Sequence, residues 1–88
     1  MTYSVRVTKQ VEDLLATLAS TEKTRARELA LVLLRLKKNP EPEDSRPLDQ
    51  TIEPGGRVWR YAGYEVVYKV DEAKKALLVG IVRIIEGV

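Results

Sequence analysis

The sequence predicts an α+β domain of order β-α-α-β-β-β, in which an αα-hairpin packs on an antiparallel sheet. Three segments rich in Val, Ile, Tyr and Trp lie between Arg57 and Ile85 and are separated by turn-like breaks, which is typical of an antiparallel meander. Two stretches with apolar residues at helical spacing precede this meander, within residues 9–38. Because the helices come before the strands of the meander, we expect them to pack on one face of the sheet. The whole chain, residues 1–88, is expected to form one domain.

The residues before the meander predict a strand and two helices. Thr2 to Val7 alternates polar and apolar residues, so it is expected to form a half-buried strand that joins the sheet of the meander. The first helix is expected from about Lys9 to Ala19, with Thr8 as its N-terminal cap. Ser20-Thr21 is expected to end this helix and to cap the second, which should stop at Lys38-Asn39 because a proline follows. So short a break predicts an antiparallel αα-hairpin.

A long loop is predicted between the second helix and the meander. Residues 41–56 contain Pro42, Pro47 and Pro54 and end in two glycines, and such residues are typical of loops. We expect a short strand or helical turn around Leu48 to Ile52 to place an apolar side chain in the core.

The register of the first two meander strands follows from the turn between them. If Ala62-Gly63 is a two-residue turn, the opposed pairs are found by counting outward. Tyr61 then faces Tyr64, Trp59 faces Val66 and Arg57 faces Tyr68 on one face, and Arg60 faces Glu65 and Val58 faces Val67 on the other. The first face carries the aromatic side chains, so we expect it to form the core rather than to stack nucleic-acid bases. The second face is expected to point outward, toward solvent or a partner.

The last strand of the meander, within Ala76 to Ile85, is apolar at nearly every position. Such a run is typical of a central strand that is covered on both faces. The helices cover only one face, and a large uncovered apolar patch is unusual on a monomer. A second chain is therefore left open as the cover of the other face, including a second copy in a homodimer.

The composition excludes several kinds of active site. The chain has no cysteine and no histidine, so it lacks a thiolate nucleophile, the commonest general base and the commonest zinc ligands. Any catalysis must therefore use Arg, Lys, Tyr, Asp or Glu, and we expect no metal and no cofactor. No apolar run approaches the roughly 20 residues of a membrane span, and the first residues do not resemble a signal peptide. We expect a cytoplasmic protein without a membrane partner.

Three parts of the chain resemble one known family. They are the opening residues Met1 to Val11, the Asn39-Pro40 end of the helical hairpin, and above all the stretch from Arg60 to Asp71. Together they resemble the RelE/ParE toxin superfamily of type II toxin–antitoxin modules. The resemblance implies the RelE-like fold and a cognate antitoxin as partner. It also implies one of two targets, because RelE-type members cleave mRNA in the ribosomal A site without metal, whereas ParE-type members inhibit DNA gyrase.

Four charged residues are the candidate catalytic residues: Arg60, Glu65, Lys69 and Arg83. By the resemblance, Arg60 matches a basic position before the turn and Arg83 lies near the arginine that ends the last strand. Glu65 stands where RelE-type members have an arginine. Cleavage of RNA through its 2′-hydroxyl requires a base for that hydroxyl and cations for the charge that builds on the phosphate. The three basic residues are expected to stabilise the phosphate.

The role of Glu65 divides the functional hypotheses. Glu65 would serve as the base if its pKa were raised, and the opposing interpretation is that it forms an ordinary cross-strand ion pair with Arg60. The leading hypothesis is a RelE-like toxin that inhibits translation by ribosome-dependent, metal-independent mRNA cleavage. The alternative is a ParE-like or degenerate member that cleaves no RNA and acts by binding a protein, either gyrase or the antitoxin only.

Overall fold

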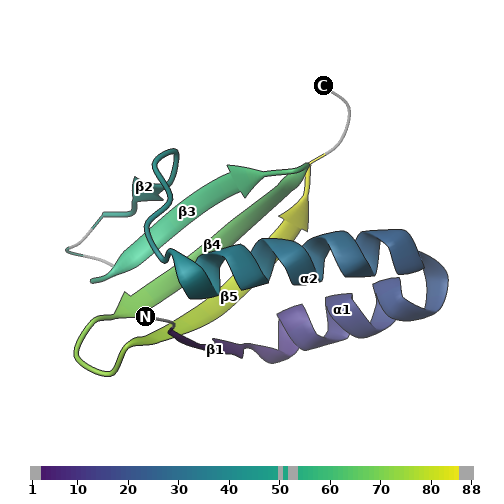
Figure 1. Cartoon of the computed structure of the whole chain (residues 1–88), viewed down its shortest axis with the longest axis horizontal. Helices are drawn as coiled ribbons and strands as arrows, with labels where there is room; N and C mark the ends of the chain where they lie inside the picture. The colour runs from purple at the N-terminus through teal and green to yellow at the C-terminus, as the bar shows by residue number, and fades with distance from the viewer. Residues whose placement is uncertain (1–2, 50, 52–53, 86–88) are drawn as a thin grey trace.

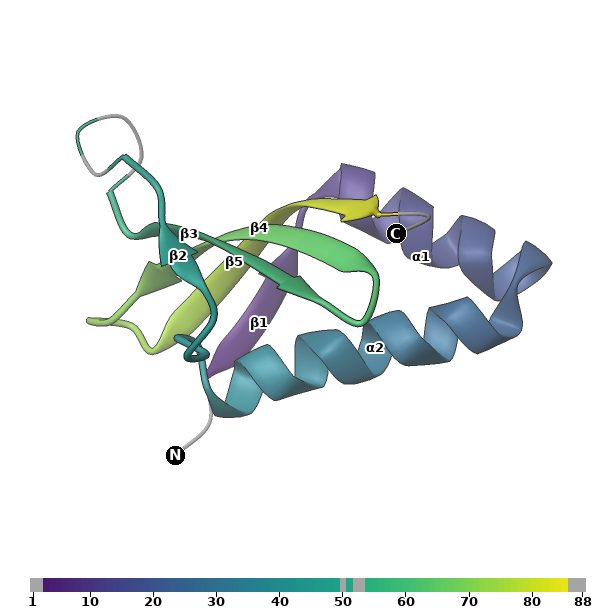
Figure 2. The same ribbon diagram turned by 90° about the horizontal axis from the view of Figure 1, so that it is seen from above.

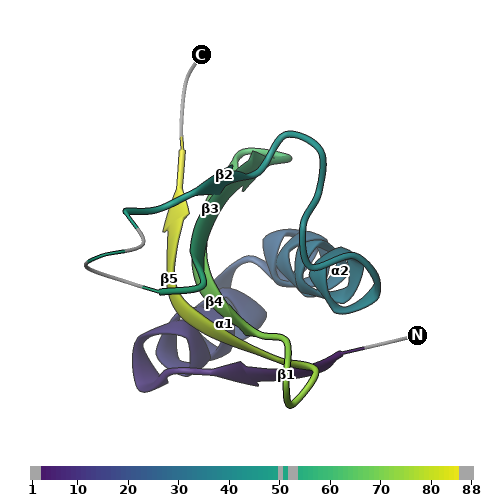
Figure 3. The same ribbon diagram turned by 90° about the vertical axis from the view of Figure 1, so that its left-hand side faces the viewer.

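The computed structural model describes residues 3–49, 51 and 54–85. Its elements are β1 (Ser4–Val7), α1 (Lys9–Thr21), α2 (Lys23–Lys38), β2 (Arg46–Pro47), β3 (Gly56–Tyr61), β4 (Tyr64–Asp71) and β5 (Ala76–Ile84). The strands form a five-stranded sheet in the order β1-β5-β4-β3-β2. Figure 1 shows both helices in front of this sheet, and Figure 3 shows the sheet curving around α2. The predicted α+β class and the packing of an αα-hairpin on a sheet are confirmed.

The sheet is mixed rather than antiparallel. β1 joins it as expected, but it runs parallel to β5, with Ser4 opposite Ala76 and Val7 opposite Val79. The backbone N–H of Thr8 continues this parallel ladder by donating to the carbonyl of Val79 at 3.1 Å. The prediction of an antiparallel sheet was wrong at this strand because the alternating pattern of a half-buried strand is the same beside a parallel or an antiparallel neighbour.

The break between the helices lies at Glu22, one residue beyond the predicted Ser20-Thr21. α1 and α2 are joined there at a tight bend (Figure 2), and Glu22 has a non-helical backbone with φ −143° and ψ 74°. The hydroxyls of Ser20 and Thr21 both donate to the carbonyl of Thr17, at 3.0 and 2.8 Å. Because these hydroxyls bond back into α1, they extend the first helix and cap neither.

Thr8 occupies the N-cap position of α1 but does not cap it through its side chain. Its Oγ1 instead donates to the carbonyl of Gly80 at 2.6 Å, so the hydroxyl ties the start of the helix to β5. α2 ends at Lys38, as predicted from the proline that follows.

The core lies between the helices and the inner face of the sheet. Its buried residues are Val11, Leu18, Leu29, Val32, Leu33, Leu36, Trp59, Tyr64, Val66, Tyr68, Leu77, Val79 and Val82. Trp59, Tyr64 and Tyr68 belong to it, as predicted, and each has a partner for its polar atom, whereas Tyr61 is half-buried and packs against this core. The hydroxyl of Tyr64 donates to the carbonyl of Arg25 at 3.2 Å, and that of Tyr68 donates to the carbonyl of Pro40 at 2.7 Å.

The β3–β4 hairpin has the predicted register. Every predicted pair is observed, from Tyr61 opposite Tyr64 to Arg57 opposite Tyr68. The turn residues Ala62 and Gly63 have φ of 54° and 85°, which matches the positive φ required at both central positions of a type I′ turn. On the other side of β4, an irregularity between Val67 and Tyr68 leaves Gly80 of β5 without an opposite residue. β5 consequently presents Leu78, Ile81 and Arg83 on the face away from the helices.

The long loop contains a strand, but not where it was predicted. The two-residue strand β2 pairs Arg46 with Val58 and Pro47 with Arg57. Leu48 is half-buried and its N–H donates to the carbonyl of Gly56 at 2.9 Å, whereas residues 50 and 52 of the predicted element lie outside the described residues. Arg57 fastens the loop to the sheet, because its guanidinium donates to Ser45 Oγ at 2.9 and 3.1 Å.

Candidate nucleic-acid interface

The outer face of the sheet, on the side away from the helices, carries two rows of paired residues. The first row, which we call the arginine row, consists of Arg60 on β3, Glu65 on β4 and Arg83 on β5. The second, the apolar row, consists of Val58, Val67 and Ile81 on the same three strands. The rows are adjacent because side chains two residues apart on a strand lie on the same face. The outer face therefore joins a charged strip to an apolar one.

Glu65 lies at the centre of the arginine row and binds both arginines. Arg60 Nε donates to its Oε2 at 2.8 Å, and Arg83 Nη2 donates to its Oε1. The Glu65 side chain is only 6% exposed, whereas those of Arg60 and Arg83 are 75% and 69% exposed. The Glu65 carboxylate on β4 thus binds the guanidinium groups of two largely exposed side chains, Arg60 on β3 and Arg83 on β5. The row carries a net charge of one positive unit, counted from two arginines and one glutamate.

Hydrogen bonds from the two arginines lower the pKa of Glu65, with the bond from Arg60 as the largest cause. The requirement set for Glu65 as a base, a raised pKa, is therefore not met. The predicted cross-strand ion pair with Arg60 is present, but Glu65 is buried and pairs with two arginines rather than one. Its geometry suits a residue that positions Arg60 and Arg83.

The whole fold matches solved structures of toxins. An archaeal RelE–RelB complex from Pyrococcus horikoshii gives a TM-score of 0.75 at 26% identity over 96% of each chain. The chain belongs to the RelE/ParE toxin superfamily. RelBE2 from Mycobacterium tuberculosis gives 0.72 at 20% identity, covering 96% of this chain and 99% of that one. A YoeB/ParE toxin from Agrobacterium tumefaciens gives 0.71 at 19% identity, with 94% and 99% covered. These last two likenesses show the fold alone.

No protein-family model matches the chain, and no curated protein matches it either. The superfamily assignment therefore rests on the arrangement of helices and strands, which is retained at low identity because many different apolar residues fill the same core.

Lys69 does not join the arginine row. It lies on the outer face of β4, opposite Gly56 and Leu78, and the apolar row separates it from Glu65. At about 3.3 Å per residue, the four residue steps from Glu65 to Lys69 place their Cα atoms roughly 13 Å apart. The structure therefore brings together Arg60, Glu65 and Arg83 and leaves Lys69 apart from them.

A hollow beside the arginine row contains residues that the sequence did not single out. Asp44, Arg46, Val58 and Arg60 line this hollow, which has a volume of about 360 Å³. β2 places Arg46 on the outer face by pairing it with Val58. No pattern in the sequence indicated this hollow, because a strand of two residues has no periodicity to recognise.

No helix in the described part of the chain is long and apolar enough to cross a membrane. Within the same residues, no group of three or more Asp or Glu side chains lies close enough together to hold a metal ion.

The lowered pKa of Glu65 predicts how stability depends on pH. A carboxyl whose folded pKa is depressed stabilises the fold fully above its unfolded pKa, and this stabilisation is lost as pH falls through the folded pKa. We expect Glu65→Gln to lose less stability than the wild type on acidification below the ordinary glutamate pKa of 4.5. Urea unfolding at a series of pH values measures this difference. A gap between the two proteins that does not change with pH would rule out the ion-pair account.

Proposed function

We propose that this chain is the toxin of a type II toxin–antitoxin module and inhibits translation by ribosome-dependent, metal-independent mRNA cleavage. The observation that carries the proposal is the arginine row, in which one buried carboxylate holds two largely exposed guanidinium groups on the outer face. The archaeal neighbour at 26% identity is a complex of RelE with RelB, which supports a cognate antitoxin as partner of this chain. The ribosome and mRNA are then its targets in the cytoplasm.

The chemistry assigned to the row is electrostatic. In RNA cleavage the 2′-hydroxyl oxygen bonds to the adjacent phosphorus, and the 5′-oxygen of the next nucleotide leaves with a proton. Guanidinium groups fixed beside that phosphate stabilise the negative charge that develops on it, and arginine forms two parallel bonds to phosphate. Glu65 fixes their positions before the RNA arrives. Because the row contains no group suited to act as base, proton transfer falls to water or to ribosomal groups, and the ribosome supplies orientation.

The alternative function, protein binding without cleavage, is favoured by the apolar row. Ile81 is 46% exposed and the neighbouring Leu78 is 44% exposed, so the predicted cover on the second face of β5 is missing in the single chain. A ParE-like or degenerate member would use this surface to bind gyrase or only its antitoxin, since partly apolar patches rimmed by charge are typical of protein interfaces. A homodimer through the same face stays a prediction.

Induced expression in bacterial cells separates these functions. Primer extension on an abundant transcript and the supercoiling of a plasmid are measured in the same culture, together with growth. We expect arrested growth and new 5′ ends in the transcript, and co-expression of the cognate antitoxin should abolish both effects. Intact transcripts with a relaxed plasmid would replace the proposal by gyrase inhibition. Unaffected growth would exclude both mRNA cleavage and gyrase inhibition, and binding to the antitoxin would remain as the only function.

A further inference from the structure

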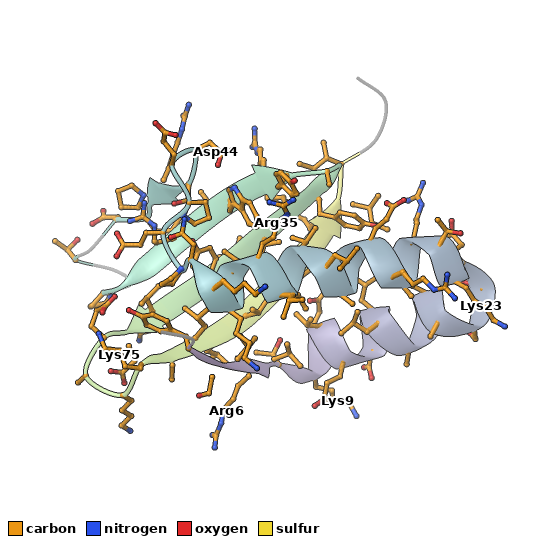
Figure 4. All side chains as sticks on the ribbon, in the orientation of Figure 1. Arg6, Lys9, Lys23, Arg35, Asp44 and Lys75 are labelled. Atoms are coloured by element: carbon orange, nitrogen blue, oxygen red, sulfur yellow. The ribbon has the colours of Figure 1, made fainter. Side chains whose placement is uncertain are left out.

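The hollow beside the arginine row combines three kinds of lining. Arg46 and Arg60 contribute positive charge, Val58 contributes an apolar wall, and Asp44 contributes a carboxylate from the loop before β2. Figure 4 shows Asp44 on that loop, next to β2. At about 360 Å³ the hollow lies in the lower part of the size range of small-molecule sites. A hollow of this volume accommodates one nucleotide.

The two arginines suit the phosphate and the flat face of a base. Guanidinium groups bind phosphate in a bidentate manner, and their planes also stack on nucleic-acid bases. Arg60 belongs to both the hollow and the arginine row, so a nucleotide in the hollow would adjoin the phosphate at the row. Val58 offers an apolar contact to the base of the same nucleotide.

Asp44 supplies the element that distinguishes one base from another. Trp59 Nε1 donates to Asp44 Oδ1 at 2.7 Å and so restrains this carboxylate, which lines the hollow. An ionised carboxylate only accepts hydrogen bonds, and each of its oxygens accepts more than one. It therefore retains capacity for a ligand that presents two adjacent donors.

Guanine is the RNA base that presents two adjacent donors. Its Watson–Crick edge carries N1–H and N2–H side by side, which match the two oxygens of a carboxylate. Adenine and cytosine each place one amino group beside a ring-nitrogen acceptor, and uracil places its single N–H between two carbonyls. A carboxylate is attracted to the first arrangement and repelled by the acceptors in the others.

We propose that the hollow lined by Asp44, Arg46, Val58 and Arg60 is a binding site for a guanine nucleotide of single-stranded RNA. The proposal rests on the proposed function in taking RNA as the natural ligand. Asp44 accepts from guanine N1–H and N2–H, and the arginines bind the phosphate and the ring face. The site gives this chain a preference for guanine at one position of its RNA.

The single tryptophan provides a direct probe, because its indole N–H is bonded to Asp44. A ¹⁵N-labelled sample is titrated with guanosine 5′-monophosphate, and the Trp59 indole peak is followed by NMR. The adenosine, cytidine and uridine monophosphates are titrated in parallel. We expect guanosine monophosphate to shift this peak with a dissociation constant about tenfold lower than that of uridine monophosphate.

Two variants test the assignment to Asp44. Asp44→Asn retains an oxygen for the Trp59 bond but puts an amide donor where guanine needs an acceptor, so the guanine preference should vanish. Glu43→Gln is the matched control: it removes one negative charge from the neighbouring position, which does not line the hollow, and should keep the preference. Unfolding temperatures equal to that of the wild type show that both variants fold.

Three results would overturn the proposal: equal binding of the guanosine and uridine nucleotides, a Trp59 peak that stays in place at millimolar guanosine monophosphate, or a preference that survives Asp44→Asn. The titration contains no ribosome, mRNA or antitoxin. A chain that binds the nucleotide but cleaves no mRNA would therefore keep this site and lose the proposed function. A chain that cleaves mRNA but does not bind the nucleotide would keep the proposed function and lose this site.

Discussion

Replacing either arginine of the arginine row by alanine is expected to lower the rate of ribosome-dependent mRNA cleavage by about 10²-fold or more. Removing one fixed donor from a site of developing negative charge has effects of this size in other enzymes, because water cannot replace a donor that is already in position. Arg60→Ala and Arg83→Ala each leave Glu65 with one guanidinium partner, so neither variant strands the buried carboxylate. The initial rate at which new 5′ ends appear on programmed ribosomes measures the effect.

Arg27→Ala is the control for these two variants. It removes the same charge from an exposed position on α2, in the layer on the opposite side of the sheet, and its cleavage rate should equal that of the wild type. Unfolding in urea shows that all three variants are folded. Wild-type rates in both Arg60→Ala and Arg83→Ala would remove the arginine row from the mechanism.

Leu29→Ala is expected to destabilise the fold by about 2 to 5 kcal/mol. Leu29 lies on the inward side of α2 with none of its surface exposed, and a leucine removed from a packed core leaves a cavity that its neighbours only partly fill. A small domain has a total stability of about 5 to 15 kcal/mol, so the loss is a large part of the whole. Urea unfolding followed by the fluorescence of Trp59 measures it, because that side chain is buried in the same core.

Leu31→Ala, two residues along the same helix, separates packing from helix propensity. Leu31 is 61% exposed, so the same substitution should change the free energy of unfolding by only about 0.5 kcal/mol. Both variants change the intrinsic helix propensity equally, which leaves burial as the difference between them. Equal losses in the two variants would show that the core is not where the structure places it.

The sheet register was predictable because it depends on local chemistry. Gly63 adopts a positive φ without a side-chain penalty, and a type I′ turn at Ala62-Gly63 fixes every pair of the β3–β4 hairpin by counting. The same counting assigned the aromatic side chains to the core and placed Arg60 opposite Glu65. The end of α2 was predictable for a similar reason, since Pro40 restricts the residue before it.

Other features depend on contacts between distant residues, which a pattern along the chain does not contain. The direction of β1 is set by its ladder with β5, more than 70 positions later in sequence. The burial of Glu65 depends on Arg83 arriving from β5 in a register shifted at Gly80. The hollow depends on β2, whose two residues are too few for any periodicity, and on a bond between Asp44 and Trp59. The last two of these features concern the candidate site rather than the core.

A purified translation reaction tests the central claim most directly. Ribosomes with a defined mRNA are incubated with and without this protein, and the mRNA is read by primer extension, in parallel with mRNA alone and with a metal chelator added. The account predicts new 5′ ends that require ribosomes, persist with the chelator and become far fewer when either Arg60 or Arg83 is replaced by alanine. Intact mRNA at excess protein would contradict it and would direct the next assay to gyrase.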